Sequence, residues 1–156
     1  MIRSVAVLAL LLVVLLAPFA PLASRANAAD IDRTIADFKT PDEIKWVRNA
    51  AGTAESAVLF GDPSKEGPYV VRIKWLPGNM SRPHFHKHDR FFAVLSGTWW
   101  MGTGENFDPN ATVPAPAGSY VIHYAGKVHY DGAKDEEAVI QVWGMGPATS
   151  TPAGKR

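Results

Sequence analysis

The sequence predicts an all-β domain, a sandwich or small barrel, preceded by a short N-terminal helical segment. Beyond residue 55 the chain consists of short apolar or alternating runs of the kind that form strands. Gly and Pro separate these runs at regular intervals, which favours a sandwich or barrel over alternating strands and helices. The chain has no cysteine, so its core and not disulfides must hold the domain together.

The first 28 residues have the pattern of a secretory signal peptide. Arg3 gives a short positive start, residues 5–17 are an almost unbroken apolar run, and Ala26-Asn27-Ala28 is a small-x-small cleavage site. We therefore expect cleavage before Ala29 and a bacterial protein that is secreted or periplasmic, with no membrane attachment afterwards. The alternative is a membrane anchor, but the apolar run is shorter than the roughly 20 residues that span a bilayer.

The remaining residues, 29–156, suit one domain. The whole chain has 16 basic and 15 acidic residues; the leader removes Arg3 and Arg25 and no acid, which leaves a formal charge of −1. No basic stripe or run stands out, so the charge pattern argues against nucleic acid as a partner. A small-molecule ligand or substrate is the expected partner.

Helix signals come directly after the leader. Thr40 is a capping residue, Pro41 occupies the first helical position, and Glu43 lies three residues after the cap. This combination predicts a short helix into Trp46. Residues 31–38 are a second candidate for a short helix.

Strands and turns alternate in the rest of the chain. Strands are expected over residues 57–60, 69–75, 91–95, 98–101, 119–124 and 138–143. Turns are expected where Gly, Pro or Asp cluster, at residues 61–63, 77–79, 96–97, 116–118 and 131–132. Residues 102–117, rich in Gly, Asn, Pro and Ala, form the longest expected loop.

All five histidines lie between residues 84 and 129. His84, His86 and His88 alternate, so an extended strand could place them on one face, while His123 and His129 come from a second segment. Neutral imidazole nitrogen is the commonest protein ligand for transition metals, and histidines of facing strands can meet inside a barrel. A single histidine is more simply a surface polar residue, but the set of five predicts a clustered functional site.

The residues around these histidines resemble the two motifs of the cupin superfamily. In that family the motifs read Gly-x5-His-x-His-x3,4-Glu-x6-Gly and Gly-x5-Pro-x-Gly-x2-His-x3-Asn. This chain has Gly78-x5-His84-x-His86-x3-Arg90-x6-Gly97 and Gly118-x5-Tyr124-x-Gly126-x2-His129, with twenty residues between the motifs. The resemblance covers at least residues 70–145 and is to small secreted single-domain bacterial cupins. It implies a single jelly-roll β-barrel, which in that family often pairs into a homodimer.

The resemblance also implies a metal site. His84, His86 and His129 match the family's histidine ligands of a divalent transition metal, which here would be Fe, Mn, Zn, Ni or Cu. Arg90 stands in place of the fourth ligand, a glutamate. The second motif departs as well, with Tyr124 in place of Pro and Ala133 in place of Asn.

Arg90 opposes a metal at this site. A cation about 6 Å from a divalent ion costs on the order of 5 kcal/mol at an effective dielectric near 20. The arginine could avoid this by pointing out of the barrel, or it could be neutralised by Asp89 or Asp131. A different donor, His88, His123 or Asp89, could also fill the vacated ligand position.

Three functions remain open from the sequence. A three-histidine metal site with open coordination positions suits a small-molecule oxygenase or isomerase. Without metal, Arg90 would be a fork for an anionic ligand in a carboxylate- or sugar-binding cupin, with His84, His86 or His129 as acid or base. A structural β-domain with a degenerate pocket is the third. No residue identifies the substrate, so none is assigned as catalytic.

Overall fold

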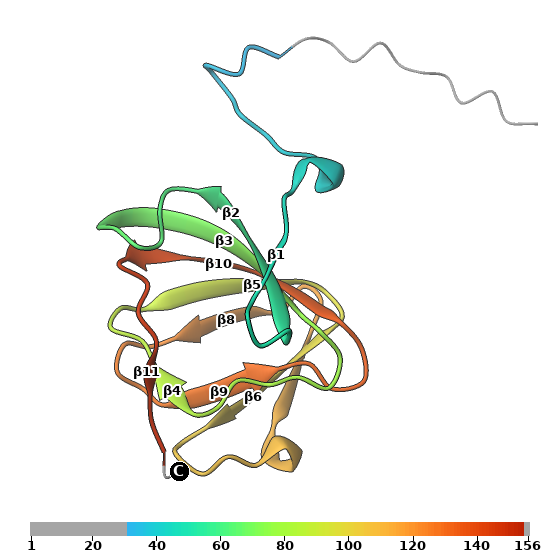
Figure 1. Ribbon diagram of the computed structural model, residues 1–156, viewed down its shortest axis with the longest axis vertical. Helices are drawn as coiled ribbons and strands as arrows, with labels where there is room; N and C mark the ends of the chain where they lie inside the picture. Colours follow the sequence, from blue (N-terminus) through green and yellow to red (C-terminus); the bar gives the residue numbers. More distant parts are fainter. Residues whose placement is uncertain (1–30, 155–156) are drawn as a thin grey trace, which may run out of the picture. The chain divides into compact units, whose positions relative to one another are not determined.

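The computed structural model describes residues 31–154, and their fold consists of two antiparallel β-sheets (Figure 1). The larger sheet has the order β1 (Val47–Arg48), β2 (Ala54–Phe60), β3 (Gly67–Trp75), β10 (Ala138–Gly146), β5 (Arg90–Ser96) and β8 (Tyr120–His123). The smaller has the order β11 (Thr151–Pro152), β4 (His84–Phe85), β9 (His129–Gly132), β6 (Thr98–Thr103) and β7 (Val113–Pro116). The all-β prediction is confirmed.

Residues 31–37 form a unit separate from residue 38 onward. The carboxylate of Asp32 accepts hydrogen bonds from the backbone nitrogen and the hydroxyl of Thr34, at 2.9 and 2.6 Å, which closes a turn. The helix expected over residues 31–38 is therefore not formed. The predicted signal peptide lies outside the described residues, and no helix within residues 31–154 is long and apolar enough to cross a bilayer.

The helix expected from Thr40 into Trp46 is also wrong: only a single 3-10 turn forms, η1 (Pro41–Glu43). The capping signal itself works, because a carboxylate oxygen of Glu43 accepts from the backbone nitrogen of Thr40 at 2.8 Å. Ile44 is already extended, and β1 then pairs with β2. Strand pairing therefore overrides the cap.

Each of the six predicted strand segments overlaps a strand, but the turn expected at residues 131–132 is wrong, because β9 runs through it and is buried throughout. A Cβ at Gly132 would collide with the backbone oxygen of Asn79. This glycine therefore marks a close approach of two chain segments, not a turn. The loop expected over residues 102–117 contains the turn η2 (Pro109–Ala111) and the proline-bearing edge strand β7.

The core lies between the facing sheets. Alternate residues of β3, β5 and β10 point inward, and Trp99 and Ile140 are the largest side chains that are fully buried. Burying a side chain such as Ile140 contributes about 1.5–3 kcal/mol. The core reaches the histidines, since the ring of His123 lies 4.7 Å from that of Phe92 and 5.3 Å from that of Trp99. A packed layer thus supports one side of the site.

Candidate metal centre

Four of the five histidines converge between the sheets. His84 in β4 lies directly opposite His129 in β9, and His86 follows β4 by one residue. His123 ends β8 and lies opposite Arg90 in the pairing with β5. His86, His123 and His129 are buried, with exposed fractions of 4, 7 and 5%. Strand pairing, not sequence proximity, brings the two motifs together.

Backbone carbonyls orient the three predicted ligands. The Nδ1 atoms bond to carbonyl oxygens as follows: His84 to Arg82 at 2.8 Å, His86 to Thr149 at 2.8 Å, and His129 to Lys127 at 2.9 Å. Because a carbonyl only accepts, each Nδ1 must carry the hydrogen and each Nε2 keeps its lone pair. All three rings are therefore fixed in the tautomer that can ligate a metal through Nε2.

The distance between two of these lone pairs fits a shared cation. The Nε2 atoms of His86 and His129 lie 3.2 Å apart, and neither carries a hydrogen in this tautomer, so the contact is repulsive and not a hydrogen bond. Two imidazole nitrogens bound tetrahedrally to one metal at 2.0–2.1 Å would lie about 3.3 Å apart. His84 completes the group, with all three ligand atoms within 4.8 Å of one another. The donor set therefore fits a divalent transition metal.

Burial keeps the imidazoles of His86 and His129 neutral. Desolvation, aided by the charge of Arg90, lowers the pKa of His86 to about 3. Desolvation likewise lowers the pKa of His129 to about 4, although its bond to the Lys127 carbonyl opposes the shift. Neutral imidazole is the ligating form, so at neutral pH a metal need displace no proton from either ring.

A second group of donors overlaps the first at His129. The ligand atoms of His123, His129 and Asp131 also lie within 4.8 Å of one another, and all three residues are buried. Burial raises the pKa of Asp131, whose carboxylate accepts a hydrogen bond from the indole of Trp99 at 3.2 Å. Asp131 was expected only as a partner of Arg90. Its place two residues after His129, on the same face of a strand, is the sequence signal that could have marked it as a donor.

Arg90 lines the cavity beside the histidines and does not point out of the barrel. Its Nη2 atom donates to the carbonyl oxygen of Thr149 at 3.0 Å, the same oxygen that accepts from His86. The expected neutralisation by Asp89 is wrong, since that carboxylate accepts from the backbone of Ala125 at 2.7 Å. Desolvation lowers the pKa of Arg90, and the charges of Tyr69 and Asp131 only oppose that shift. Asp131 makes no ion pair with Arg90 within the described chain.

The remaining predicted donors, His88 and Asp89, lie elsewhere. They line a groove on the outer face of the larger sheet, together with Lys87, Phe91 and Trp143, and we call it the outer groove. Neither residue lines the inner cavity, so neither takes the place of the missing glutamate.

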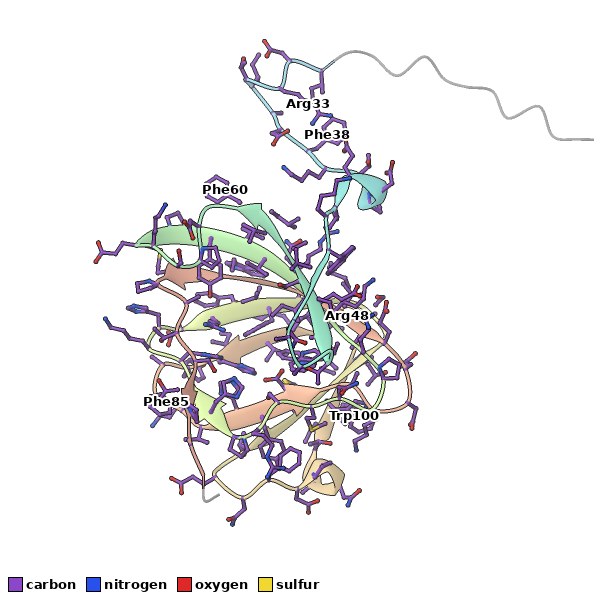
Figure 2. The ribbon with its side chains drawn as sticks, in the orientation of Figure 1. Arg33, Phe38, Arg48, Phe60, Phe85 and Trp100 are labelled. Atoms are coloured by element: carbon purple, nitrogen blue, oxygen red, sulfur yellow. The ribbon has the colours of Figure 1, made fainter. Side chains whose placement is uncertain are left out.

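The inner cavity has a volume of about 360 Å³. Its walls include Ile73, Phe92 and Ile140, and its rim includes Ser150 and Pro152 of the C-terminal segment. That segment runs beside β4, where Thr151 pairs with Phe85 (Figure 2). The chain's end therefore supplies both a rim and the Thr149 carbonyl, neither of which was foreseen.

Two facing antiparallel sheets with histidines converging between them define a cupin. Residues 36–149 match the family model of the ChrR cupin-like domain, so the chain belongs to this family of the cupin superfamily. No curated protein sequence matches the chain.

Solved structures resemble the chain in fold. The polyketide cyclase RemF from Streptomyces resistomycificus has 15% identity and a TM-score of 0.63, with 77% of this chain and 87% of that chain covered. An uncharacterised double-stranded β-helix protein from Klebsiella pneumoniae has 24% identity and a TM-score of 0.57, with 76 and 97% covered. A cupin-like protein from Thermotoga maritima has 19% identity and a TM-score of 0.54, with 69 and 80% covered. These likenesses establish the double-stranded β-helix of cupins as the fold.

Proposed function

We propose that this chain is an exported metal-dependent cupin. His84, His86 and His129 hold a divalent transition metal, and a small molecule is transformed in the adjacent cavity by oxygenation or isomerisation. One observation carries the proposal: each of the three rings is fixed through Nδ1 on a backbone carbonyl, and one ligand atom of each ring lies within 4.8 Å of the others. A satisfied polar core would not leave lone pairs facing each other at 3.2 Å.

When bound, the metal supplies Lewis acidity and open coordination positions for the substrate. The chain's own residues enclose the substrate and supply a group that can hold a proton. Phe92 and Ile140 wall the cavity and restrict water. Asp131 is the lining residue suited to hold a proton, because burial raises its pKa.

Export belongs to the proposal because of the leader pattern of residues 1–28. The mature protein would then be residues 29–156, in the periplasm or outside the cell, with a small molecule as its partner. Edman sequencing of the protein recovered from the host's periplasm or medium checks this, with Ala29 expected as the first residue. Recovery of uncleaved chain from the membrane fraction would favour the anchor instead.

Metal content is the primary test. Protein purified from its own host is expected to carry about one equivalent of a transition metal, as measured by elemental mass spectrometry. The double variant His84→Ala/His86→Ala should carry almost none. His88→Ala is the matched control, because His88 belongs to the same run of alternating histidines but lines the outer groove, and it should retain the metal. Equal metal in the wild type and the double variant would overturn the proposal.

The two reaction classes separate in a second assay. Metal-loaded protein is incubated with a panel of small carboxylic acids, phenols and sugars while dissolved oxygen is recorded. Substrate-dependent oxygen uptake identifies an oxygenase. Substrate conversion without oxygen uptake or change in mass identifies an isomerase.

A further inference from the structure

The inner cavity contains a half-buried cation, Arg90, without a matching anion. Arg90 has five N–H donors, and within residues 31–154 the guanidinium makes one hydrogen bond, to the Thr149 carbonyl. It forms no ion pair with any carboxylate of those residues. A charge withdrawn from water without a partner costs free energy, and a ligand anion would remove that cost.

Two more nitrogens of the cavity lining lack partners. The indole Nε1 of Trp75 and the Nδ1 of His123 are buried, and neither has a hydrogen-bond partner among the described residues. Both residues line the same cavity as Arg90. An indole nitrogen only donates, so its partner must be an acceptor. Buried donors without partners are rare enough that each calls for a specific explanation.

Acceptors on the lining do not match these donors. Asp131 is the one carboxylate among the residues that line the cavity, and it already accepts from Trp99. Apart from the histidine lone pairs assigned to the metal, the unpaired groups are the N–H donors of Arg90 and Trp75, so a ligand must bring acceptor oxygens. Its volume of about 360 Å³ suits a small organic molecule, with apolar walls for the rest of the ligand.

We propose that the inner cavity is a receptor for a small organic carboxylate, with Arg90 as the residue that binds the carboxylate group. The planar guanidinium presents paired N–H groups that match the two oxygens of a carboxylate. Trp75, elsewhere on the lining of the same cavity, offers a donor to a second acceptor of a ligand long enough to reach it. The inference names small carboxylates as the substrate class of the proposed function. It rests on that function only for what happens to the end of the ligand that faces the histidines.

The proposal accounts for an arginine at the position where the family has glutamate. A bound carboxylate neutralises Arg90 and removes its repulsion from the metal. Metal and carboxylate should therefore increase each other's affinity by the same factor, since the coupling between two ligands is reciprocal.

Benzoate is a suitable probe, with benzamide as its uncharged counterpart of the same shape. Mature protein is titrated by calorimetry after metal removal and after loading with Zn²⁺. Benzoate is expected to bind the loaded protein at least tenfold more tightly than benzamide or inorganic phosphate. Arg90→Gln should weaken benzoate binding at least tenfold, and Arg90→Lys should weaken it less.

Lys87→Gln is the matched control, because this neighbouring cation lines the outer groove, and it should leave benzoate affinity unchanged. Equal benzoate affinity in the wild type and Arg90→Gln overturns the carboxylate receptor, as does tighter binding of phosphate or benzamide. Benzoate binding that depends on Arg90 in a protein that takes up no metal leaves the receptor standing and refutes the metal site. Metal uptake without benzoate binding leaves the metal site standing and refutes the carboxylate receptor.

Discussion

The inner cavity and the outer groove both take histidines from one run of alternating residues, His84 and His86 inside and His88 outside, yet a cluster of donors forms only around the inner cavity. The outer groove is larger, about 760 against 360 Å³, so size alone selects the wrong place. In the inner cavity, carbonyls fix the rings and lone pairs converge. In the outer groove, His88 stands among apolar residues such as Phe91 and Trp143, and Phe60, exposed by 60%, projects from the sheet (Figure 2). Fixed, converging donors define the site, and histidine spacing does not.

The largest effect should come from replacing His86, whereas replacing the nearby His88 should have almost none. His86→Ala removes a ligand fixed by the Thr149 carbonyl and should lower the affinity for Zn²⁺ at least a thousandfold. His88→Ala should change it less than twofold. Competition with a chromophoric chelator measures both. Similar losses in the two variants would mean that the outer groove contributes to metal binding.

Acid should destabilise the metal-free protein because its inner histidines are neutral. The unfolded chain takes up protons on histidine near pH 6.5, whereas His129 in the folded protein does so only near its lowered pKa of about 4. The unfolded state thus binds more protons between these values, and the free energy of unfolding falls as the pH falls through this window. His129 alone accounts for about 3 kcal/mol across the window. Asp131 opposes the trend, since its pKa is raised on folding and its protonation favours the folded state.

Urea unfolding of chelator-treated protein, repeated from pH 7.5 to pH 4, measures this slope. His129→Gln removes one titrating ring and should flatten the dependence. A variant with the wild-type slope would show that the acid sensitivity arises from groups other than His129. Added Zn²⁺ should raise the unfolding midpoint at neutral pH, because only the folded protein holds the three ligands together.

Reversing the charge inside the cavity should strengthen metal binding. Arg90→Glu removes a cation from the cavity and introduces a carboxylate next to the histidines, so the affinity for Zn²⁺ should rise at least about thirtyfold. Lys87→Glu makes the same charge change in the outer groove and should raise it less than threefold. A similar response of the two variants would mean that net charge, and not position, governs the affinity. The same variant, Arg90→Glu, should no longer bind benzoate.

Much of this comparison follows from the sequence, but not all of it. Alternation and glycine turns predict the strands, and Gly97 fits its turn because its φ of 67° is in the left-handed region and a Cβ would strike the Glu137 carbonyl. His84 and His86 follow from spacing. His88 could not be placed, because β4 ends at Phe85 and the period of two does not extend across the turn into β5. Asp131 was hidden because Asp-Gly is typical of a turn.

Thr149 shows a different limit, because its contribution to the inner cavity is a backbone carbonyl, which every residue type carries. No pattern of side chains could have indicated it. The rim formed by the C-terminal segment was missed for the same reason, since β11 is a two-residue strand recognised by its pairing with β4.

The smallest effect that we expect comes from removing the Thr149 carbonyl. Ending the chain after Gly146 removes β11 together with Thr149, whose carbonyl accepts from both His86 and Arg90. The Nδ1 of His86 loses its acceptor, while the carbonyls that hold His84 and His129 remain in the chain. Loss of such an outer partner lowers metal affinity about 10- to 100-fold, and we expect the lower end because one ligand of three is released. Thr149→Ala keeps the carbonyl and removes only the hydroxyl, which accepts from the Lys87 backbone at 3.3 Å, so it should bind Zn²⁺ as the wild type does. A tenfold loss in Thr149→Ala would assign the effect to the hydroxyl. Unchanged affinity in the shortened chain would mean that the tautomer of His86 is fixed without the C-terminal segment, since the ring would still present Nε2 to the metal.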